Sequence, residues 1–408
     1  SSVGPHLMVS RTDILFVLSN SNIGGPQKSL LALLDVIDHE KFNVSLYILR
    51  PGGRLEQHLS DKVRILPSDE LIMAATLPSD RALEALVILL KRGRFRMFLS
   101  SVLAILRHLV RGSNMNQERQ RIWQRYANEL PSIEGSYDLA FGILGMASYC
   151  VVDCVEAARR FHWVRSDSRI LKRDENIDGA YYQRMDGALA VSNDCATIFE
   201  EMYPFMRGRV RVFHNHIPVG LYRTLDSELS LMEGRNGHTK ILTVCRLDPL
   251  KGIEMAIDAC KVLVDAGLKV DWFVLGDGPF RADVESMIRR EGLQDSFSLL
   301  GFQLNTLAFI EACDVFVHPS RTEGKANTVD EAKYAGKPIV VTNYATVADQ
   351  ITHGVNGIVC EMNAEAIADS VECLMSDQAL ASRLAAACKG REDGLQDVSA
   401  FFEDLCEG

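Results

Sequence analysis

The residues best suited to chemistry lie in the stretch Ser320–Val340, SRTEGKANTVDEAKYAGKPIV. Two carboxylates, Glu323 and Glu331, stand on either side of a run of small residues. On one continuous helix they would lie roughly 12 Å apart along the axis and about 80° apart around it, too far to act on one small group. Gly324 favours a helix that begins near Thr328 instead, with Glu323 in the preceding loop and Glu331 in the first turn.

A helix that begins there predicts an anion site at its N-terminus. It leaves four backbone N–H groups without a helical partner, those of Lys325, Ala326, Asn327 and Thr328. The helix dipole contributes only about 0.3–1 kcal/mol at an exposed end, so a diphosphate would also need cations. The candidates are Arg246 and Lys251, in the loop CRLDPLKG after an apolar run. Arg can hold phosphate through two N–H groups, and Lys supplies a compact charge.

A structural explanation competes with this one. Thr328 and Glu331 fit the S/T-x-x-E capping box, so capping explains Glu331 as well as ligand binding does. Gly324 makes Glu323 a poor first-turn residue, which favours a ligand contact for that carboxylate. The lone histidines beside apparent strand ends, His162, His214 and His216, are more often structural than catalytic.

The elements that must position these residues follow the same sequence pattern in two regions of the chain. Short apolar runs alternate with helix-length amphipathic segments, which is typical of parallel sheets built from βαβ units. The runs are DILFVLS, NVSLYIL, YDLAFGI, RFHWVRS and GALAVS, then KILTVCRL, DWFVLGDGP, SFSLLGF, DVFVHPS, KPIVVTN and GIVC. In such sheets, ligands bind beyond the carboxyl ends of the strands. The sequence therefore predicts an α/β chain of two doubly wound halves, with the ligand between them.

A chain of 408 residues is long for a single core, and two domains are expected. We assign residues 9–225 to an N-terminal acceptor-binding domain and 226–390 to a C-terminal donor-binding domain. A helical insertion is expected at about 85–130, and a C-terminal helix in 391–408 should return toward the N-terminal domain. Residues 1–8, SSVGPHLM, have the composition of a cloning-tag remnant.

Bulk composition excludes several classes of protein. A net charge of -10 argues against a chain that coats nucleic acid. No apolar run reaches the roughly 18 residues that a membrane span requires. The ten cysteines are scattered without a CxxC pair, which favours a reducing, cytoplasmic compartment over a zinc site. No DxD pair is present to hold a divalent cation on a diphosphate, so no metal and no other cofactor is expected.

One segment reverses the overall charge. Lys91–Arg125 contains nine Lys or Arg residues and a single acid, Glu118, a local charge of +8 in a chain of -10. Interleaved Phe and Leu residues predict a basic amphipathic helix. It either packs on the N-terminal domain with its charges solvated, or binds an anionic membrane at about 1 kcal/mol per well-placed cation. In the second case, vesicle binding should require anionic lipid and weaken with salt.

The motifs as a set resemble a known family. VCRLDPLKGIEMAIDA, VLGDGPFRADVE, LLGF, CDVFVHPSRTEGKANTVDEAKYAGKPIVVTN and GVNGIVC are similar, in order and spacing, to the C-terminal half of family 4 glycosyltransferases. The similarity is close over residues 240–375 and looser before them, in GGPQKS and RFHWVRSD. It implies a GT-B fold, with two Rossmann-like domains facing each other across a cleft. The branch that it most resembles builds bacterial capsular and exopolysaccharides.

The resemblance also implies roles for the candidate residues. Arg246 and Lys251 would neutralise the donor diphosphate, and the amides after Glu323 would hold its distal phosphate. Glu323 would contact the sugar hydroxyls, and Glu331 would hold the ribose.

Further implied roles come with two departures from the family pattern. The Gly301–Phe302 loop would lie near the base, and Gly25 would let the backbone approach the phosphates. Gln27 replaces an acidic residue that is common in the family loop GGxE. WVRSD replaces WIHxD, so that Arg165 and Asp167 become the acceptor-side candidates and a negatively charged acceptor is an open alternative.

The resemblance implies a metal-independent, retaining hexosyltransferase that uses a nucleotide-diphosphate sugar, with UDP favoured over GDP. The acceptor would be a glycan or lipid-linked saccharide in surface polysaccharide synthesis, at the inner face of the cell membrane. Two alternatives stay open: a catalytically silent nucleotide-sugar-binding protein and a nucleotide-sugar epimerase on the same fold.

Overall fold

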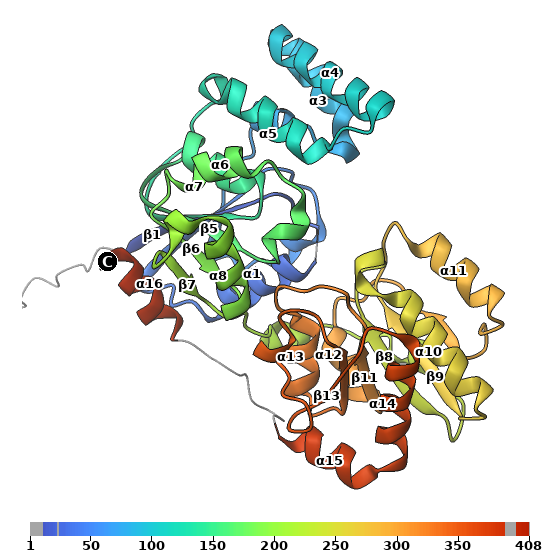
Figure 1. Ribbon diagram of the computed structural model, residues 1–408. Helices are drawn as coiled ribbons and strands as arrows, with labels where there is room; N and C mark the ends of the chain where they lie inside the picture. The colour runs from blue at the N-terminus through green and yellow to red at the C-terminus, as the bar shows by residue number, and fades with distance from the viewer. Residues whose placement is uncertain (1–10, 23, 388–396, 408) are drawn as a thin grey trace, which may run out of the picture. The chain divides into compact units, whose positions relative to one another are not determined.

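The computed structural model describes residues 11–22, 24–387 and 397–407, which fall into two compact units. The first extends to Phe213 and includes the C-terminal helix α16 (Val398–Glu407), and the second begins at His214 (Figure 1). The expected tag remnant at 1–8 and the segment 391–396 lie outside the described residues.

The first unit is built on a seven-stranded parallel sheet in the order β3-β2-β1-β4-β5-β6-β7. Its strands are β1 (Thr12–Leu18), β2 (Phe42–Ile48), β3 (Val63–Ile65), β4 (Ser136–Ile143), β5 (Glu156–Val164), β6 (Gly187–Ala190) and β7 (Val210–Val212). The five strands that the sequence predicts are all present. The edge strands β3 and β7 have three residues each, too short to produce a recognisable apolar run.

Helices pack against this sheet, which explains why its central strands are apolar without alternation. The helices of the unit before α16 are α1 (Gly25–Val36), α2 (Glu70–Ala75), α3 (Ala82–Lys91), α4 (Phe95–Arg111), α5 (Met115–Tyr126), α6 (Met146–Cys154), α7 (Glu175–Tyr182) and α8 (Asn193–Met202). Of these, α3 and α4 pack mainly on α2 and α5 and lie away from the strands (Figure 1). Helix α16 completes the core, because Phe402 packs edge-on against Phe16 and Phe141 at centroid distances of 6.2 and 5.4 Å.

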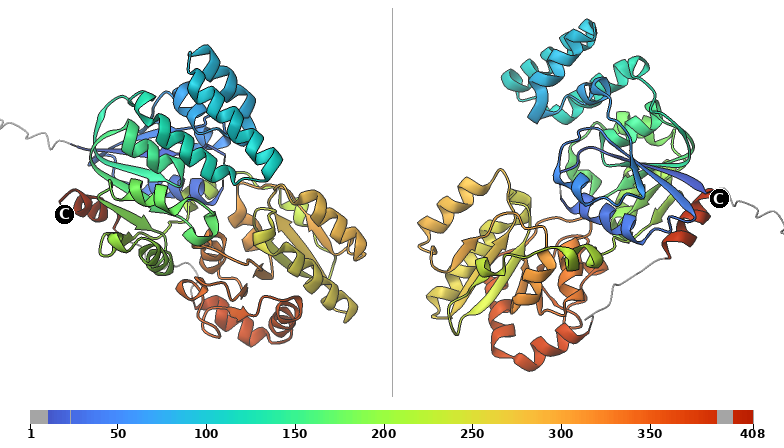
Figure 2. Two further views of the ribbon diagram at one scale, coloured as in Figure 1. Left: turned by 45° about the horizontal axis from the view of Figure 1, so that its top comes forward. Right: turned by 180° about the vertical axis from the view of Figure 1, so that it is seen from behind.

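The basic segment is not the single helix expected: it begins at the last residue of α3, contains α4 and ends within α5. Gly93 and Gly112, with φ of 68° and 64°, separate α3 from α4 and α4 from α5, because glycine adopts this left-handed conformation at low cost. Helix α4 contacts both α3 and α5, and the three lie together in both views of Figure 2. Along the described chain, no helix combines the length and apolarity needed to cross a membrane.

The second unit contains a six-stranded parallel sheet in the order β10-β9-β8-β11-β12-β13. Its strands are β8 (Thr239–Val244), β9 (Val270–Leu275), β10 (Phe297–Leu299), β11 (Val315–His318), β12 (Ile339–Thr342) and β13 (Ile358–Cys360). Its helices are α9 (Val219–Thr224), α10 (Ile253–Asp265), α11 (Arg281–Arg290), α12 (Thr306–Ala312), α13 (Asn327–Tyr334), α14 (Ala364–Ser376) and α15 (Gln378–Ala386). All six predicted strands are present.

The boundary between the units lies at His214, earlier than the expected 225/226. Helix α9 belongs to the second unit because Tyr222 and Ile217 are buried against Leu307 of α12. Asn305 fastens the same helix by donating to the carbonyl oxygens of Tyr222 and Leu225, each at 3.0 Å. The polar stretch after residue 224 follows this helix and does not mark the division.

Glycines let the loops at the carboxyl ends of the second sheet lie against one another. Gly276, in GDGP, has φ of 134°, and a Cβ there would stand 1.8 Å from the Cys245 carbonyl oxygen. Gly252, with φ of 64°, would place a Cβ 2.1 Å from the Pro319 carbonyl oxygen. Only glycine satisfies both the backbone conformation and the space at these two positions.

Candidate functional site

Two neighbouring strands of the second sheet bring distant charged residues together. Strand β8 pairs with β11, so the loop that carries Arg246 and Lys251 lies beside the loop that carries Glu323. The Lys251 Nζ donates to the Glu323 Oε1 at 2.6 Å. Arg246 stays more open, with 65% of its side chain exposed and its guanidinium 3.9 Å from Asp248. The predicted juxtaposition of carboxylate and cations is present in this unit.

A histidine that the sequence analysis did not select completes this group. His318 is the last residue of β11 and is 3% exposed. Its Nε2 lies 2.9 Å from the same Glu323 Oε1. Nε2 therefore carries the proton in the neutral ring, while Nδ1 has no hydrogen-bond partner among the described residues. The position of His318 at the end of a predicted strand was the sequence feature that could have indicated it.

Glu323 is held ionised by its neighbours. Burial raises the pKa of its carboxyl, but the charge of Lys251 and the hydrogen bond from His318 outweigh burial and bring the pKa to about 2. The carboxylate therefore accepts hydrogen bonds at neutral pH and does not serve as a proton donor. Such a group is suited to binding sugar hydroxyls or to stabilising positive charge.

The backbone around Glu323 is fixed by hydroxyl side chains. The Ser320 hydroxyl donates to the carbonyl oxygens of Leu250, at 3.3 Å, and Thr322, at 3.1 Å. The Thr346 hydroxyl donates to the Glu323 carbonyl oxygen at 3.0 Å. Since these bonds tie the loops after β8, β11 and β12 together, the carboxylate projects from a braced turn.

The lowered pKa predicts how stability depends on pH. The ion pair should contribute fully above the ordinary pKa near 4.5 and lose its contribution as pH falls through about 2. The Glu323→Gln variant should lack this contribution, at most about 3 kcal/mol. Urea unfolding at pH 6, 4 and 2.5 measures it: the wild-type advantage should shrink as pH falls. A constant difference over this range would contradict the assignment.

The start of α13 corrects two predictions. The helix begins at Asn327 after Ala326, with no side-chain cap, so the predicted capping box is wrong. Thr328 instead directs its hydroxyl to the Val244 carbonyl oxygen at 3.4 Å. Nor is the Ala326 N–H free for an anion, because it donates to Oε1 of Gln350 at 2.9 Å while Nε2 of Gln350 donates back to the Ala326 carbonyl oxygen.

Glu331 lies in a buried polar cluster within the second unit. It is 1% exposed. Its Oε1 accepts from the Tyr222 hydroxyl at 2.6 Å, and its Oε2 accepts from the Thr306 hydroxyl at 2.7 Å. Both partners come from segments that precede Glu331 in the chain, so neither could be foreseen from the motif. These contacts give Glu331 a structural role, and its ribose contact stays a prediction.

The remaining donor-side candidates lie at the start of α13 and in the loop after β10. Lys325 directs its Nζ to Asp330 at 3.1 Å and is 4% exposed, so its side chain is already engaged. The Asn327 side-chain oxygen accepts from Asn215 at 2.6 Å. The Gly301–Phe302 loop is held to the loop after β9, where the Gly276 N–H donates to the Gly301 carbonyl oxygen at 2.8 Å.

Gly25, Arg165 and Asp167 belong to the first unit. Gly25 is the first residue of α1, and the nearby Gln27 donates to the Asn20 carbonyl oxygen at 3.3 Å. Asp167 forms an ion pair with Arg169 at 2.6 Å. The Arg165 guanidinium lies 5.6 Å from the centroid of the Trp163 ring. Burial lowers the pKa of Arg165 to about 10, which leaves it charged at neutral pH.

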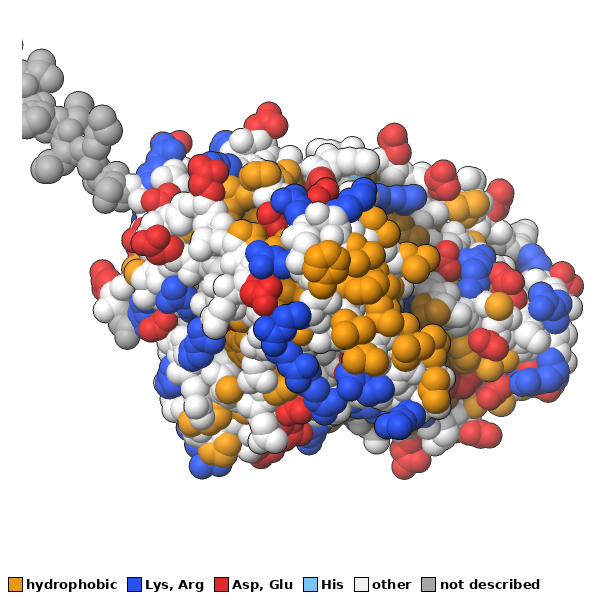
Figure 3. Space-filling view, turned by 90° about the horizontal axis from the view of Figure 1, so that it is seen from above, with side chains coloured by type: hydrophobic (Ala, Val, Ile, Leu, Met, Phe, Trp, Pro, Cys, Tyr) orange, Lys and Arg blue, Asp and Glu red, His pale blue; other side chains and the backbone are white. Residues whose placement is uncertain are grey.

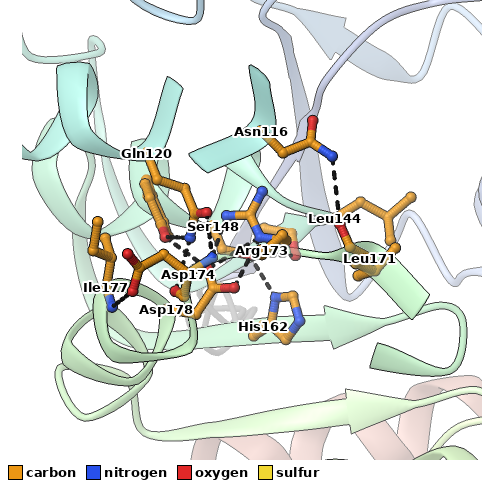
Figure 4. Close-up of polar contacts among 12 residues, drawn as sticks. Asn116, Gln120, Leu144, Ser148, His162, Leu171, Arg173, Asp174, Ile177 and Asp178 are labelled. Carbon is orange, nitrogen blue, oxygen red and sulfur yellow. Dashed lines mark hydrogen bonds and ion pairs between the residues drawn. The ribbon is translucent and has the colours of Figure 1, made fainter. Parts of the chain in front are cut away.

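A polar cluster that includes His162 lies beside Arg165, and its other members were not predicted from the sequence. The Ser148 hydroxyl donates to the Gly142 carbonyl oxygen at 3.1 Å and therefore accepts from His162 Nδ1, at 2.6 Å. Burial and the charge of Arg173 lower the pKa of His162 to about 3, so its ring is neutral. Arg173 in turn binds both carboxylate oxygens of Asp178 at 2.8 Å (Figure 4).

This cluster is assembled from β4, α6, β5 and α7, so no single motif predicts it. A small pocket adjoins it, lined in part by Leu144, His162, Arg165 and Arg173. The pocket lies at the carboxyl ends of β4 and β5. It gives the acceptor-side candidate Arg165 a polar, cationic surrounding within the first unit.

Comparison with known proteins shows what the second unit is similar to. Residues 233–391 match the family model described as glycosyl transferases group 1. The amylovoran biosynthesis glycosyltransferase AmsK of Erwinia amylovora is 30% identical over 149 residues, 34% of this chain and 37% of that protein. The lipopolysaccharide core biosynthesis glycosyltransferase LpsE of Rhizobium meliloti is 29% identical over 146 residues, which are 36% of this chain and 42% of that protein. The chain thus spans less than half the length of these curated relatives.

Similarity of fold extends over nearly the whole chain. The crystal structure of Anabaena Alr3699/HepE in complex with UDP-glucose covers 97% of this chain, and 99% of its own, with a TM-score of 0.66 and 17% identity. With the two doubly wound parallel sheets, this similarity confirms the predicted GT-B fold class.

Proposed function

We propose that this chain is a retaining glycosyltransferase that uses a nucleotide-diphosphate sugar, because residues 233–391 match the family model described as glycosyl transferases group 1. The acceptor is a glycan or lipid-linked saccharide in the synthesis of a surface polysaccharide such as a capsule. AmsK and LpsE, whose names place them in amylovoran and lipopolysaccharide core biosynthesis, support this acceptor class. The UDP-glucose complex of HepE supports a UDP-sugar as donor.

The observation that carries the proposal is the ionised Glu323 beside Lys251, His318 and the exposed Arg246. Arg246 is available to a diphosphate as the structure stands. Lys251 already neutralises one carboxylate and can share its charge with a phosphate at the same strand ends. Two cations of this kind replace the charge that a metal ion would supply, which is the basis for proposing metal-independent transfer.

The transfer itself needs position and charge more than a strong base. In the retaining reaction that we propose, the acceptor hydroxyl attacks the anomeric carbon from the face that the diphosphate leaves. The C–O bond to phosphate breaks, the new glycosidic bond forms, and the hydroxyl proton passes to the departing phosphate oxygen. Glu323 holds the sugar, while Arg246 and Lys251 stabilise the charge that develops on the diphosphate.

Incubation with radiolabelled UDP-sugars and GDP-sugars in the absence of acceptor tests this proposal. Slow release of free sugar with retained anomeric configuration, faster from the UDP donor, is the expected result. Binding without turnover would favour the catalytically silent alternative, and a changed sugar still attached to its nucleotide would favour the epimerase. Both outcomes would overturn transfer as the activity.

Arg246→Gln should weaken donor use without weakening the fold. Losing a charge-assisted phosphate contact should raise the KM for the donor about 10-fold to 100-fold, while the melting temperature should stay unchanged because the side chain is exposed. Steady-state kinetics over a donor series measure the change. Arg290→Gln is the matched control, because Arg290 is 68% exposed in the same unit. An unchanged KM in Arg246→Gln would exclude the phosphate contact.

We also propose that the protein acts at the inner surface of an anionic membrane, to which it binds through residues 91–125. A lipid-linked acceptor would make such a location useful. The expected electrostatic contribution is lower than the sequence implies, because several of these cations are already paired within the protein.

A further inference from the structure

Helix α4 turns its apolar face to solvent and not to the core. Six large apolar side chains on this helix are 47–79% exposed, namely Phe95, Leu99, Leu103, Leu106, Leu109 and Val110. The opposite side, which packs against the protein, consists of Met97, Ser101 and Ala104, all 0% exposed. The helix is amphipathic as predicted, but its orientation is the reverse of an ordinary surface helix.

The neighbouring helix α3 extends the same surface. Leu83, Val87 and Leu90 recur at helical spacing and are 80%, 47% and 41% exposed. Helices α3 and α4 contact each other. Figure 3 shows orange apolar side chains gathered in one area, with Lys and Arg along its border. We call this area, formed by the nine exposed side chains of α3 and α4, the apolar face.

An exposed apolar face of this size is expected to bind a partner. Soluble monomers rarely leave so many large apolar side chains side by side in water, and contiguous patches of this kind mark sites of interaction. The small residues on the packed side show that α4 was not built to bury its Leu and Phe side chains against this unit.

The charges around the apolar face narrow the choice of occupant. Arg92 and Arg94 pair with Glu70 and Glu129, at 3.3 and 3.1 Å. Arg107 and Arg121 both pair with the buried Glu118, at 2.7 and 3.4 Å. Within the described ranges, the Lys and Arg residues of the segment with no acidic partner are Lys91, Arg96, Arg111, Arg125 and Arg119, the last of which hydrogen-bonds to the Leu77 carbonyl oxygen.

Two of these cations lie on α4 itself. At 100° per residue, Arg96 follows Leu103 at one edge of the apolar stripe, whereas Arg111 lies about 60° farther around the helix, at its C-terminal end. A second copy of this chain, docked face to face about a two-fold axis, would present the same arginines and not the anionic groups that complement them. Anionic lipid headgroups would instead complement them, while the acyl region accepts the apolar side chains.

We propose that the apolar face of α3 and α4 inserts into the interface of an anionic lipid membrane, and that burial of its apolar side chains supplies most of the binding. Arg96 and Arg111 orient the helices toward anionic headgroups. This mode of docking differs from attraction by net charge, because it persists in salt. It stands on the exposed side chains alone and holds whether or not the chain transfers a sugar.

Flotation of the full chain with vesicles tests the proposal. Vesicles of phosphatidylcholine, alone or with one third phosphatidylglycerol, are compared in 0.1 M and 0.5 M NaCl. Binding to the anionic vesicles should survive high salt with only a several-fold loss. Leu99→Glu/Leu106→Glu should reduce it at least about 10-fold at both salt concentrations, since two charges enter the apolar stripe. These positions are 58% and 49% exposed, so the fold should remain intact.

Two further variants serve as a control and as a test of the electrostatic contribution to vesicle binding. Val355→Glu, at a 54% exposed position of the second unit, is the matched control and should bind as the wild type does. Arg96→Gln/Arg111→Gln should weaken binding to anionic vesicles in 0.1 M NaCl and leave the weaker binding to neutral vesicles unchanged.

Fluorescence supplies a direct readout of insertion. The three native tryptophans, Trp123, Trp163 and Trp272, are at most 2% exposed, so a Leu103→Trp variant adds the one water-facing indole. Its emission should shift to the blue when anionic vesicles are added.

Three results would overturn the proposal. One is unchanged vesicle binding by Leu99→Glu/Leu106→Glu. Another is loss of all wild-type binding in 0.5 M NaCl, which would restore the purely electrostatic account. The third is a wild-type dimer in sedimentation equilibrium that this double variant abolishes, in a protein that ignores vesicles; the apolar face would then be a self-association surface.

Discussion

Replacing Glu323 with glutamine should lower kcat for sugar transfer by about 100-fold to 1000-fold, the loss seen when one group that stabilises transition-state charge is removed. The carboxylate is buried beside Lys251 and His318, so its charge acts in a site of low dielectric. Glutamine keeps the shape and can still accept from His318 Nε2, which isolates the charge from the packing. Steady-state kinetics with saturating donor and acceptor would measure the effect.

Glutamine is a sharper test than alanine at this position. Alanine would leave both Lys251 and His318 without their shared acceptor, and the resulting loss of stability would obscure the loss of function. Glu285→Gln is the matched control, because Glu285 is a 42% exposed carboxylate of the same unit, paired with Arg281. A large fall in melting temperature with near-normal kcat in Glu323→Gln would assign a structural role to the carboxylate.

Replacing Glu331 with alanine should cost roughly 2–4 kcal/mol of unfolding free energy, the largest stability effect that we expect from one residue of the motif. The reason is burial: Tyr222 and Thr306 would each lose the carboxylate oxygen that accepts their hydroxyl proton. Urea unfolding at neutral pH would measure the change. The same carboxylate fastens α9 to the second unit, so α9 should also lose protection from hydrogen exchange.

Tyr222→Phe separates this structural contribution from a ligand contact. It removes the hydroxyl that bonds to Glu331 but leaves the carboxylate in place, and it should cost about 1.5–3 kcal/mol without changing the KM for the donor. If Glu331→Ala proved as stable as the wild type and raised only the donor KM, the carboxylate would serve the ligand alone.

Much of the fold was predictable from the sequence. Strands that are covered by helices on both faces must be apolar throughout, and runs such as Ile14–Leu18 therefore stand out from the helices between them. The site residues of the second unit were predictable for a related reason. Loops at the carboxyl ends of parallel strands meet at one edge, so Lys251 and Glu323 had to lie near each other once β8 and β11 were neighbours.

Other features could not be predicted because their causes lie far away in the chain. The capping box at Thr328 has the correct spacing, yet the Thr328 hydroxyl donates to the Val244 carbonyl oxygen and Glu331 accepts from Tyr222 and Thr306 instead. His318 looked like one more strand residue until the fold placed it against Glu323. A local pattern lists the interactions that a residue can make, and the tertiary partners decide which one it makes.

The sequence by itself determined the two parallel sheets, the glycine-bearing loops and the motif that carries Glu323 and Glu331, because apolar runs and glycine conformations are local properties. Only the tertiary structure decided which charges pair and which way α4 faces. Periodicity establishes that Leu99 and Leu106 lie on the same side of the helix, but it does not say whether that side faces the core or solvent. Only the packing of the helix decides this. Here the small side chains of Ser101 and Ala104 pack inward, and the apolar stripe is left facing solvent.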